Sequence, residues 1–247
     1  MIKYILLGVV QGLTEFLPVS SSGHLVILQK VLGIPDHQVA ISVALHLGTL
    51  LAIAVFFGKD ILNLFRDFKR LFLVVVVVII TGVIGVLGKN FFENFFSSVK
   101  LIGVAWVFTG ILLISTKRIT QLNRDELKFK DALILGLTQS LAIVPGISRS
   151  GITLSTLFFR KVNRDLAFSF SFLVSIPIIL GAVVLESKKI AAIAKTDIIN
   201  LGIGMVFSFV VGLAALLFLR KVIHREKFYY FGYYCLLMAA VTWLFIR

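Results

Sequence analysis

Polar residues interrupt two otherwise apolar stretches of this chain, and this feature limits its possible folds more than any other. The first interruption covers residues 11–24, Gln-Gly-Leu-Thr-Glu-Phe-Leu-Pro-Val-Ser-Ser-Ser-Gly-His. The second lies within 138–153, where Thr-Gln is followed by Pro-Gly-Ile-Ser-Arg-Ser-Gly-Ile-Thr. A charged group at the centre of a bilayer costs about 2.5–3.5 kcal/mol on insertion scales. Such groups usually face one another or water, so we expect both interruptions to serve chemistry or transport.

The composition predicts an all-α integral membrane protein. The 247 residues are 59% hydrophobic, with a mean hydropathy of +1.03, which leaves too little polar surface to cover a soluble core. Six apolar runs are long enough to cross a bilayer at about 1.5 Å per residue. They cover residues 38–57, 71–88, 99–115, 165–185, 199–219 and 228–246.

The charged residues indicate how these runs are threaded. The net charge is +13, but the lysines and arginines lie mostly in short loops, where they contact anionic membrane lipids. We therefore expect no nucleic-acid partner. If the two broken regions are re-entrant hairpins, four loops share one side: 58–70, 116–130, 160–164 and 220–227. These loops hold 16 lysines and arginines, against eight on the other side. If both regions span, the division is 14 against 10, so the positive-inside rule favours the hairpins.

The hairpin topology divides a single membrane domain, residues 1–247, into two inverted repeats. Residues 1–115 would form the first, with a re-entrant hairpin at about 2–34 followed by three transmembrane helices. Residues 116–247 would form the second, with its hairpin at about 131–160. The sequence Gly-Leu-Thr-Glu at 12–15 has a counterpart in Gly-Leu-Thr-Gln at 136–139. Binding sites in inverted repeats lie near the midplane, where broken helices meet, so we expect the two interruptions to form one site.

Glu15 is the acid of the first interruption. It could act as a general base or bind a hard cation, so Mg²⁺ or Ca²⁺ is a candidate cofactor that the sequence does not establish. Gln11 lies four residues earlier and shares the helix face of Glu15, so we expect its amide to take part in binding a substrate phosphate. For His46, which lies in the predicted span 38–57, we expect a structural hydrogen bond rather than catalysis.

The residues after Glu15 predict an anion cradle. Pro18 should end the first helix, and a second short helix should begin near His24. Small side chains and free amides at a helix start bind anions, and here they belong to Ser20, Ser21, Ser22 and Gly23. Ser21 or Ser22 could attack phosphorus while His24 takes the proton, or His24 could attack directly.

Arg149 is the strongest candidate in the second interruption. Its guanidinium stays charged, and its planar fork matches phosphate oxygens. Ser148, Ser150 and Thr153 could add hydroxyl hydrogen bonds beside it. The alternative is a structural ion pair between Arg149 and Glu15, which could form in the resting state and still open to receive a phosphate.

These two motifs resemble the signature motifs of the undecaprenyl-diphosphate phosphatases, the bacitracin-resistance family. The resemblance covers essentially the whole chain in length, segment order and motif spacing. It implies interlocked inverted repeats in a bacterial inner membrane, with the active site open to the outer, periplasmic side. It also implies hydrolysis of undecaprenyl diphosphate to undecaprenyl phosphate and inorganic phosphate. That reaction recycles the lipid carrier of peptidoglycan synthesis and confers resistance to bacitracin.

The resemblance also implies residue roles. Glu15 matches the family's essential second acid, Ser21 the motif serine and His24 the motif histidine. Three residues match the phosphate-binding segment: Ser148, Arg149 and Thr153. Gln11 departs from the double-acid version of the motif, because many members have glutamate there. An amide cannot act as a base or bind a metal strongly, so Glu15 is left as the acid that could fill either role.

Two other function classes compete with a membrane phosphatase acting on a prenyl diphosphate lipid. An inverted-repeat transporter or flippase for a prenyl-phosphate lipid could use the Glu15–Arg149 pair to gate an anionic headgroup. The cluster of serines and a histidine with Arg149 favours the enzyme. Another lipid-phosphatase class also uses a Ser-Gly-His element, but no histidine follows Arg149 at a suitable distance. The sequence allows a homodimer without requiring one.

Overall fold

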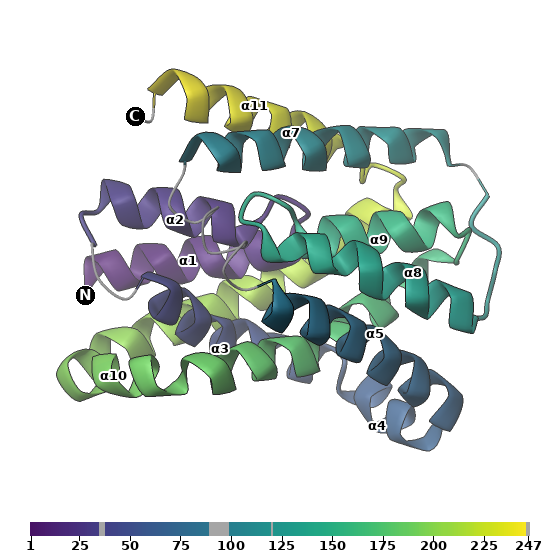
Figure 1. Ribbon diagram of the computed structural model, residues 1–247, viewed down its shortest axis with the longest axis horizontal. Coiled ribbons are helices and arrows are strands. Elements are labelled where there is room, and N and C mark those ends of the chain that lie inside the picture. Colours follow the sequence, from purple (N-terminus) through teal and green to yellow (C-terminus); the bar gives the residue numbers. More distant parts are fainter. Residues whose placement is uncertain (35–37, 89–98, 120, 246–247) are drawn as a thin grey trace.

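The computed structural model describes residues 1–34, 38–88, 99–119 and 121–245, and helices form most of this part of the chain (Figure 1). Within the described residues there is no β-strand beyond an isolated bridge between Arg124 and Val162. Two short 3₁₀ helices, Thr116–Arg118 and Leu141–Ile143, follow α7 and α8. The α-helices are α1 (Ile2–Phe16), α2 (Ser21–Val31), α3 (Gln38–Phe56), α4 (Gly58–Arg66), α5 (Phe68–Leu87), α7 (Val99–Ser115), α8 (Phe129–Ser140), α9 (Arg149–Phe159), α10 (Arg164–His224) and α11 (Tyr230–Phe245).

Among the described residues, five segments are long and apolar enough to cross a membrane, which confirms the predicted all-α integral membrane protein. They are Val39–Phe56, Phe68–Leu87, Val99–Arg118, Arg164–Ile193 and Asp197–His224. The predicted span 228–246, whose last residue lies outside the described residues, corresponds to α11. The apolar part of α11, Tyr230–Leu244, is shorter than the other five segments.

The long helix α10 contains two of the predicted spans, 165–185 and 199–219. Asp197 interrupts it with non-helical angles, φ −145° and ψ 32°. The chain then folds back, because Arg220 near the end of α10 lies 3.5 Å from the carboxylate of Asp165 near its start. The two predicted spans are therefore antiparallel arms separated at Asp197.

The first broken region folds as a pair of short helices whose outer ends lie together. α1 stops at Phe16, and Leu17 is extended with φ −66° and ψ 143°, as expected for a residue that precedes a proline. At the other end, the Lys3 ammonium donates a hydrogen bond to the carbonyl of Leu32 at 2.6 Å. The region 2–34 thus returns to the end of the molecule from which it starts.

The second broken region has the same form. Arg160, just after α9, donates from Nε to the carboxylate of Asp131 in the first turn of α8, at 2.7 Å. Arg124 also approaches this carboxylate, at 2.8 Å, and Asp131 is buried. Two arginines therefore compensate the buried acid that joins the two ends of the region 131–160.

The two hairpins come from opposite ends of the molecule and meet at their tips. In Figure 1 the start of α1 lies at one end, and the start of α8 lies at the other, where Phe129 stacks on Phe72 of α5. At the tips, the amide of Gly146 donates to Ser20 Oγ at 3.0 Å. This arrangement supports the inverted repeat, although the duplication of the two halves stays a prediction.

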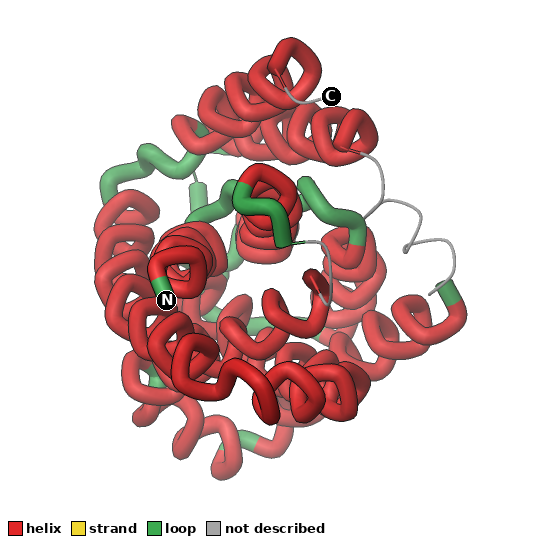
Figure 2. Tube along the Cα trace, turned by 90° about the vertical axis from the view of Figure 1, so that its left-hand side faces the viewer, coloured by secondary structure: helices red, strands yellow, loops and turns green. Residues whose placement is uncertain are grey.

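The four basic loops gather at one end of the molecule, as the hairpin topology requires. The ion pair Lys69–Glu126 connects loops 58–70 and 116–130, and Arg164–Glu226 connects loops 160–164 and 220–227. The backbone amide of Arg124 donates to the carbonyl of Lys161 at 3.0 Å and so links loop 116–130 to loop 160–164. If both broken regions spanned, loops 160–164 and 220–227 would lie at the other end. Figure 2, viewed along the long axis of the molecule, shows the helices around the hairpins, with the α7–α11 pair on one side.

Close backbone approach between α1 and α10 fixes the position of the first hairpin. A Cβ atom placed on Gly12 would lie 2.6 Å from the carbonyl oxygen of Ser208 and 2.9 Å from the amide of Gly212. Backbone atoms cannot move aside as a flexible side chain can. Only glycine fits there, and it brings the α1 turn that carries Glu15 against α10.

We predict that Gly12→Ala destabilises the protein by about 1–3 kcal/mol, because the added methyl group overpacks this contact. Gly82→Ala is the matched control, since a Cβ there meets no atom within 4 Å and alanine is the better helix former. Thermal unfolding in detergent measures both variants. Equal midpoints for Gly12→Ala and the wild type would show that α1 and α10 are not held this closely.

Candidate active site

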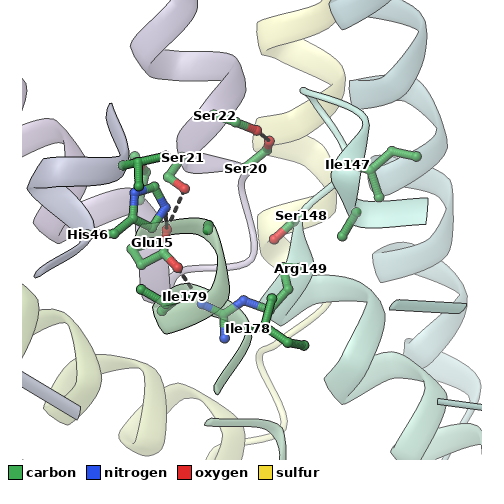
Figure 3. A pocket seen from close by; sticks show the side chains of 14 residues that line it. Glu15, Ser20, Ser21, Ser22, His46, Ile147, Ser148, Arg149, Ile178 and Ile179 are labelled. Atoms are coloured by element: carbon green, nitrogen blue, oxygen red, sulfur yellow. Dashed lines mark hydrogen bonds and ion pairs between the residues drawn. The ribbon is translucent and has the colours of Figure 1, made fainter. Parts of the chain in front are cut away.

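A cavity of ≈ 160 Å³ lies where the two hairpin tips meet (Figure 3). Its apolar wall comes from α3, the loop before α9 and the middle of α10, and it includes Val43, Ile147, Ile178 and Ile179. Its polar wall combines both interruptions with one residue of α3. These polar residues are Thr14, Glu15, Ser20, Ser21, Ser22, His46, Ser148 and Arg149.

Glu15 is the centre of the polar wall. It is buried near the end of α1, and its two carboxylate oxygens have different partners. Ser21 Oγ donates to Oε2 at 2.6 Å, and the Gln11 amide nitrogen donates to the same oxygen at 3.2 Å. The imidazole Nε2 of His46 lies 3.1 Å from Oε2, whereas Arg149 pairs with Oε1. The predicted Glu15–Arg149 ion pair is therefore present.

Arg149 reaches Glu15 from the first turn of α9. Ser148 caps this helix, and its hydroxyl accepts a hydrogen bond from the Gly151 amide at 3.1 Å. The terminal nitrogen Nη1 of Arg149 is buried and has no hydrogen-bond partner among the described residues. A buried guanidinium N–H without a partner is costly, so Nη1 is a donor that the described residues leave unsatisfied.

Ser20 joins the two tips and shapes the start of α2. Its φ of 69° lies in the left-handed region, which is strained for a serine. Its hydroxyl accepts hydrogen bonds from the amides of Gly146 at 3.0 Å and Gly23 at 3.4 Å. The hydroxyl of Ser22 lies 3.3 Å from that of Ser20. Ser20 therefore holds the backbone in place, while Ser21 next to it is bound to Glu15.

Two helix N-termini face the cavity, as the predicted anion cradle requires. α2 begins at Ser21 and α9 at Arg149, and the capping residues Ser20 and Ser148 both line the cavity. The positive ends of two helix dipoles with Arg149 between them favour an anionic ligand.

Four residues predicted to bind phosphate lie behind this wall and do not line the cavity. Gln11 and Gly23 support Glu15 and Ser20, as described above. The Ser150 hydroxyl donates to the carbonyl of Leu17 at 3.2 Å, and the Thr153 hydroxyl donates to the carbonyl of Arg149 at 2.8 Å. In this structure these four residues support the residues that line the cavity.

His24 also points away from the cavity. Its Nδ1 lies 2.7 Å from the carbonyl oxygen of Ser20, and its Nε2 lies 2.8 Å from the hydroxyl of Tyr234 on α11. The ring stacks on Tyr234 and meets Trp106 edge-on. The face of α2 that carries His24 packs on the α7–α11 pair, so the structure does not bring this histidine to Glu15 or Arg149. The catalytic role of His24 stays a prediction.

His46 lines the site, although sequence reasoning assigned it only a structural role. We expected a structural hydrogen bond, and its Nδ1 lies 2.6 Å from the carbonyl oxygen of Ser42. Its other nitrogen faces Glu15 across the cavity wall (Figure 3). The sequence contains no signal for this contact, because a lone histidine in an apolar helix can face any neighbour.

The side chains around the cavity offer few ligands for a divalent cation. Among the described residues, no three His, Cys, Asp or Glu side chains lie together so that they could hold a metal ion. Glu15 is the carboxylate available, and its oxygens already accept hydrogen bonds from Ser21 and Gln11 and pair with Arg149. Mg²⁺ is often bound by one or two carboxylates together with substrate phosphates. A cation at Glu15 would therefore depend on the phosphates of a bound substrate, and it stays a prediction.

Comparison with known proteins assigns this arrangement to a family. The family model described as "Bacitracin resistance protein BacA" matches residues 4–241. A protein of Alkaliphilus metalliredigens named undecaprenyl-diphosphatase is 40% identical, over 98% of this chain and 98% of its own length. Proteins with the same name from Halothermothrix orenii and Thermotoga petrophila are 40% and 38% identical, over 94% and 97% of this chain and 93% and 98% of their own lengths. The family model and these relatives show that the chain, whose two motifs face one another across the cavity, belongs to the bacitracin resistance protein BacA family.

Proposed function

We propose that this membrane protein hydrolyses undecaprenyl diphosphate to undecaprenyl phosphate and inorganic phosphate. The observation that carries the proposal is the Glu15 carboxylate, which accepts a hydrogen bond from the Ser21 hydroxyl and pairs with Arg149. A base, a hydroxyl nucleophile and a phosphate-binding cation are the groups that phosphoryl transfer needs. The name undecaprenyl-diphosphatase of the relatives supports the same reaction.

Ser21 is the best placed of the three nucleophiles that the sequence left open, Ser21, Ser22 and His24. Its hydroxyl is 2.6 Å from Glu15, so the carboxylate can take the proton as Oγ attacks the terminal phosphorus. The bond from that phosphorus to the bridging oxygen breaks, and the lipid monophosphate leaves. Water then attacks the phosphorus of the phosphoserine, and the bond from phosphorus to Ser21 Oγ breaks. Glu15 returns its proton to Oγ as that bond breaks, and the protons of the attacking water leave with the inorganic phosphate. His24 has neither nitrogen directed at the cavity.

Arg149 supplies charge stabilisation. Its unpartnered Nη1 can bind a phosphate oxygen directly, and a substrate phosphate can then compete with Glu15 for the rest of the guanidinium. The amides at the starts of α2 and α9 add fixed dipoles. Charge that develops on the transferred phosphoryl group is stabilised most strongly by such preorganised donors.

The size of the cavity fits a headgroup and excludes the lipid tail. A volume of ≈ 160 Å³ equals the share of about five water molecules at roughly 30 Å³ each. A diphosphate can occupy this space, whereas a long prenyl chain must remain outside it, in the bilayer. The apolar residues Ile147, Ile178 and Ile179 of the wall offer contacts for the first isoprene units.

The loop charges support an orientation in a bacterial inner membrane. The end of the molecule with loops 58–70 and 220–227 would face the cytoplasm by the positive-inside rule. In a bacterium, hydrolysis at the periplasmic side would recycle the carrier lipid of peptidoglycan synthesis. A homodimer stays a prediction.

We expect the purified protein in detergent to release inorganic phosphate from a prenyl diphosphate. Ser21→Ala should lower kcat by at least about 10³-fold, because the nucleophile is lost. Rapid quenching should trap a phosphoserine at residue 21 in the wild type. A flippase would bind the lipid and release no phosphate, and a phosphohistidine at residue 24 would exclude Ser21.

Parallel assays of phosphate release with a chelator, followed by added Mg²⁺, test whether the reaction needs a divalent cation.

Arg149→Ala should lower kcat/KM by about 10³-fold or more, as expected when the cation that stabilises a transferring phosphoryl group is removed. Arg149→Lys should recover only part of this loss, because an ammonium group lacks the planar fork. Arg225→Ala, at an exposed position after α10, is the matched control and should keep full activity. Near-normal phosphate release by Arg149→Ala would contradict the proposed reaction site.

A further inference from the structure

We propose that His46 is a positioning residue that holds Glu15 against Ser21 once a substrate phosphate has drawn Arg149 away. This inference rests on the proposed function and deepens it. It assigns a role to a residue that lies outside both motifs, on a different helix.

The contacts of Glu15 divide between its two oxygens. Arg149 pairs with Oε1, whereas Ser21, Gln11 and His46 approach Oε2. A diphosphate that enters the cavity competes with Glu15 for Arg149, because both are anions beside the same guanidinium. When Arg149 changes partner, Oε1 loses its contact. The carboxylate then depends on the contacts at Oε2 to stay on the Ser21 hydroxyl.

Of the contacts at Oε2, the one from His46 comes from outside the first hairpin, from α3. Its Nδ1 is 2.6 Å from the carbonyl oxygen of Ser42, one turn earlier on α3. A backbone carbonyl and an ionised carboxylate can only accept, so both ring nitrogens donate. The His46 ring is then an imidazolium, with Nδ1 on the Ser42 carbonyl and Nε2 on Glu15. Its neighbours Ala44 and Leu45 are fully buried, and this packing fixes α3 at this point. The ring thus joins a rigid part of α3 to Oε2.

Gln11 cannot replace this contact. It lies on α1, as Glu15 does, so it moves together with the residue that it would have to hold. Its amide nitrogen is 3.2 Å from Glu15 and 3.5 Å from the Thr49 hydroxyl. Its carbonyl oxygen is buried without a hydrogen-bond partner among the described residues. Gln11 is therefore poorly satisfied itself, and His46 provides the better-anchored support.

Figure 3 places Glu15 between His46 and Arg149. His46 approaches Oε2 of Glu15, whereas Arg149 pairs with Oε1 on the other side of the carboxylate. We therefore assign His46 an effect on the turnover step through Glu15, with little direct effect on substrate binding.

Two substitutions of His46 distinguish its contact with the Ser42 carbonyl from its contact with Glu15. His46→Gln can place an amide N–H near the former Nε2 and keep the contact to Glu15. His46→Asn can keep the hydrogen bond to the Ser42 carbonyl but is too short to reach Glu15. We expect His46→Asn to lower kcat by about 10–100-fold, as misplacing a catalytic group by about 1 Å does, with KM changed by less than about threefold. His46→Gln should stay within about fivefold of the wild-type kcat.

Phosphate release by the full-length protein in detergent measures kcat and KM, and thermal unfolding measures stability. His224→Ala is the control histidine, because it pairs with Asp165 far from the cavity, and it should match the wild type. Wild-type kcat in His46→Asn would overturn the inference, and so would a raised KM with unchanged kcat. Equal loss of kcat in the Gln and Asn variants would also overturn it, whether or not stability falls. A wild-type protein that releases no phosphate would instead refute the proposed function.

Discussion

The ion pair between Glu15 and Arg149 is the interaction on which the rest of the structure depends. Each charge alone within a membrane protein would cost several kcal/mol, and each lies at the tip of a broken helix. Pairing them requires both tips to reach the same depth from opposite ends. The backbone at the tips is then satisfied inside the protein, since Ser20 accepts from the Gly146 amide and Ser150 donates to a carbonyl of the other tip.

The two matching sequences, Gly-Leu-Thr-Glu and Gly-Leu-Thr-Gln, have different surroundings. Gln139 occupies the position that matches Glu15, and its amide donates to the hydroxyl of Thr81 at 3.1 Å. Thr81 in turn donates to the carbonyl of Gly136 at 3.3 Å. An amide needs no counter-charge, so the Gln139 side chain packs as a neutral support. The single acid explains why one half of the molecule supplies the base while the other supplies the arginine.

The interpretation of Gln11 changes once its structural surroundings are known. The sequence shows only that a second acid is missing, which weakens any mechanism with two carboxylates. In the structure the amide nitrogen of Gln11 faces Glu15, as an amide donor should beside a carboxylate. Together with Ser21, His46 and Arg149, it surrounds a single carboxylate with hydrogen-bond donors and a cation. One base and one hydroxyl are sufficient for the proposed transfer to Ser21.

The sequence by itself determined the membrane class, the two breaks and the family. Length and hydropathy of each apolar run are local properties, and a proline such as Pro18 ends a helix wherever it occurs. Tertiary structure decided which histidine meets the acid. His24 was the predicted catalytic histidine, yet the face of α2 that carries it packs on Tyr234, whereas His46 on α3 faces Glu15. The direction of a side chain depends on which helix face is buried against which neighbour, and local sequence does not specify that contact.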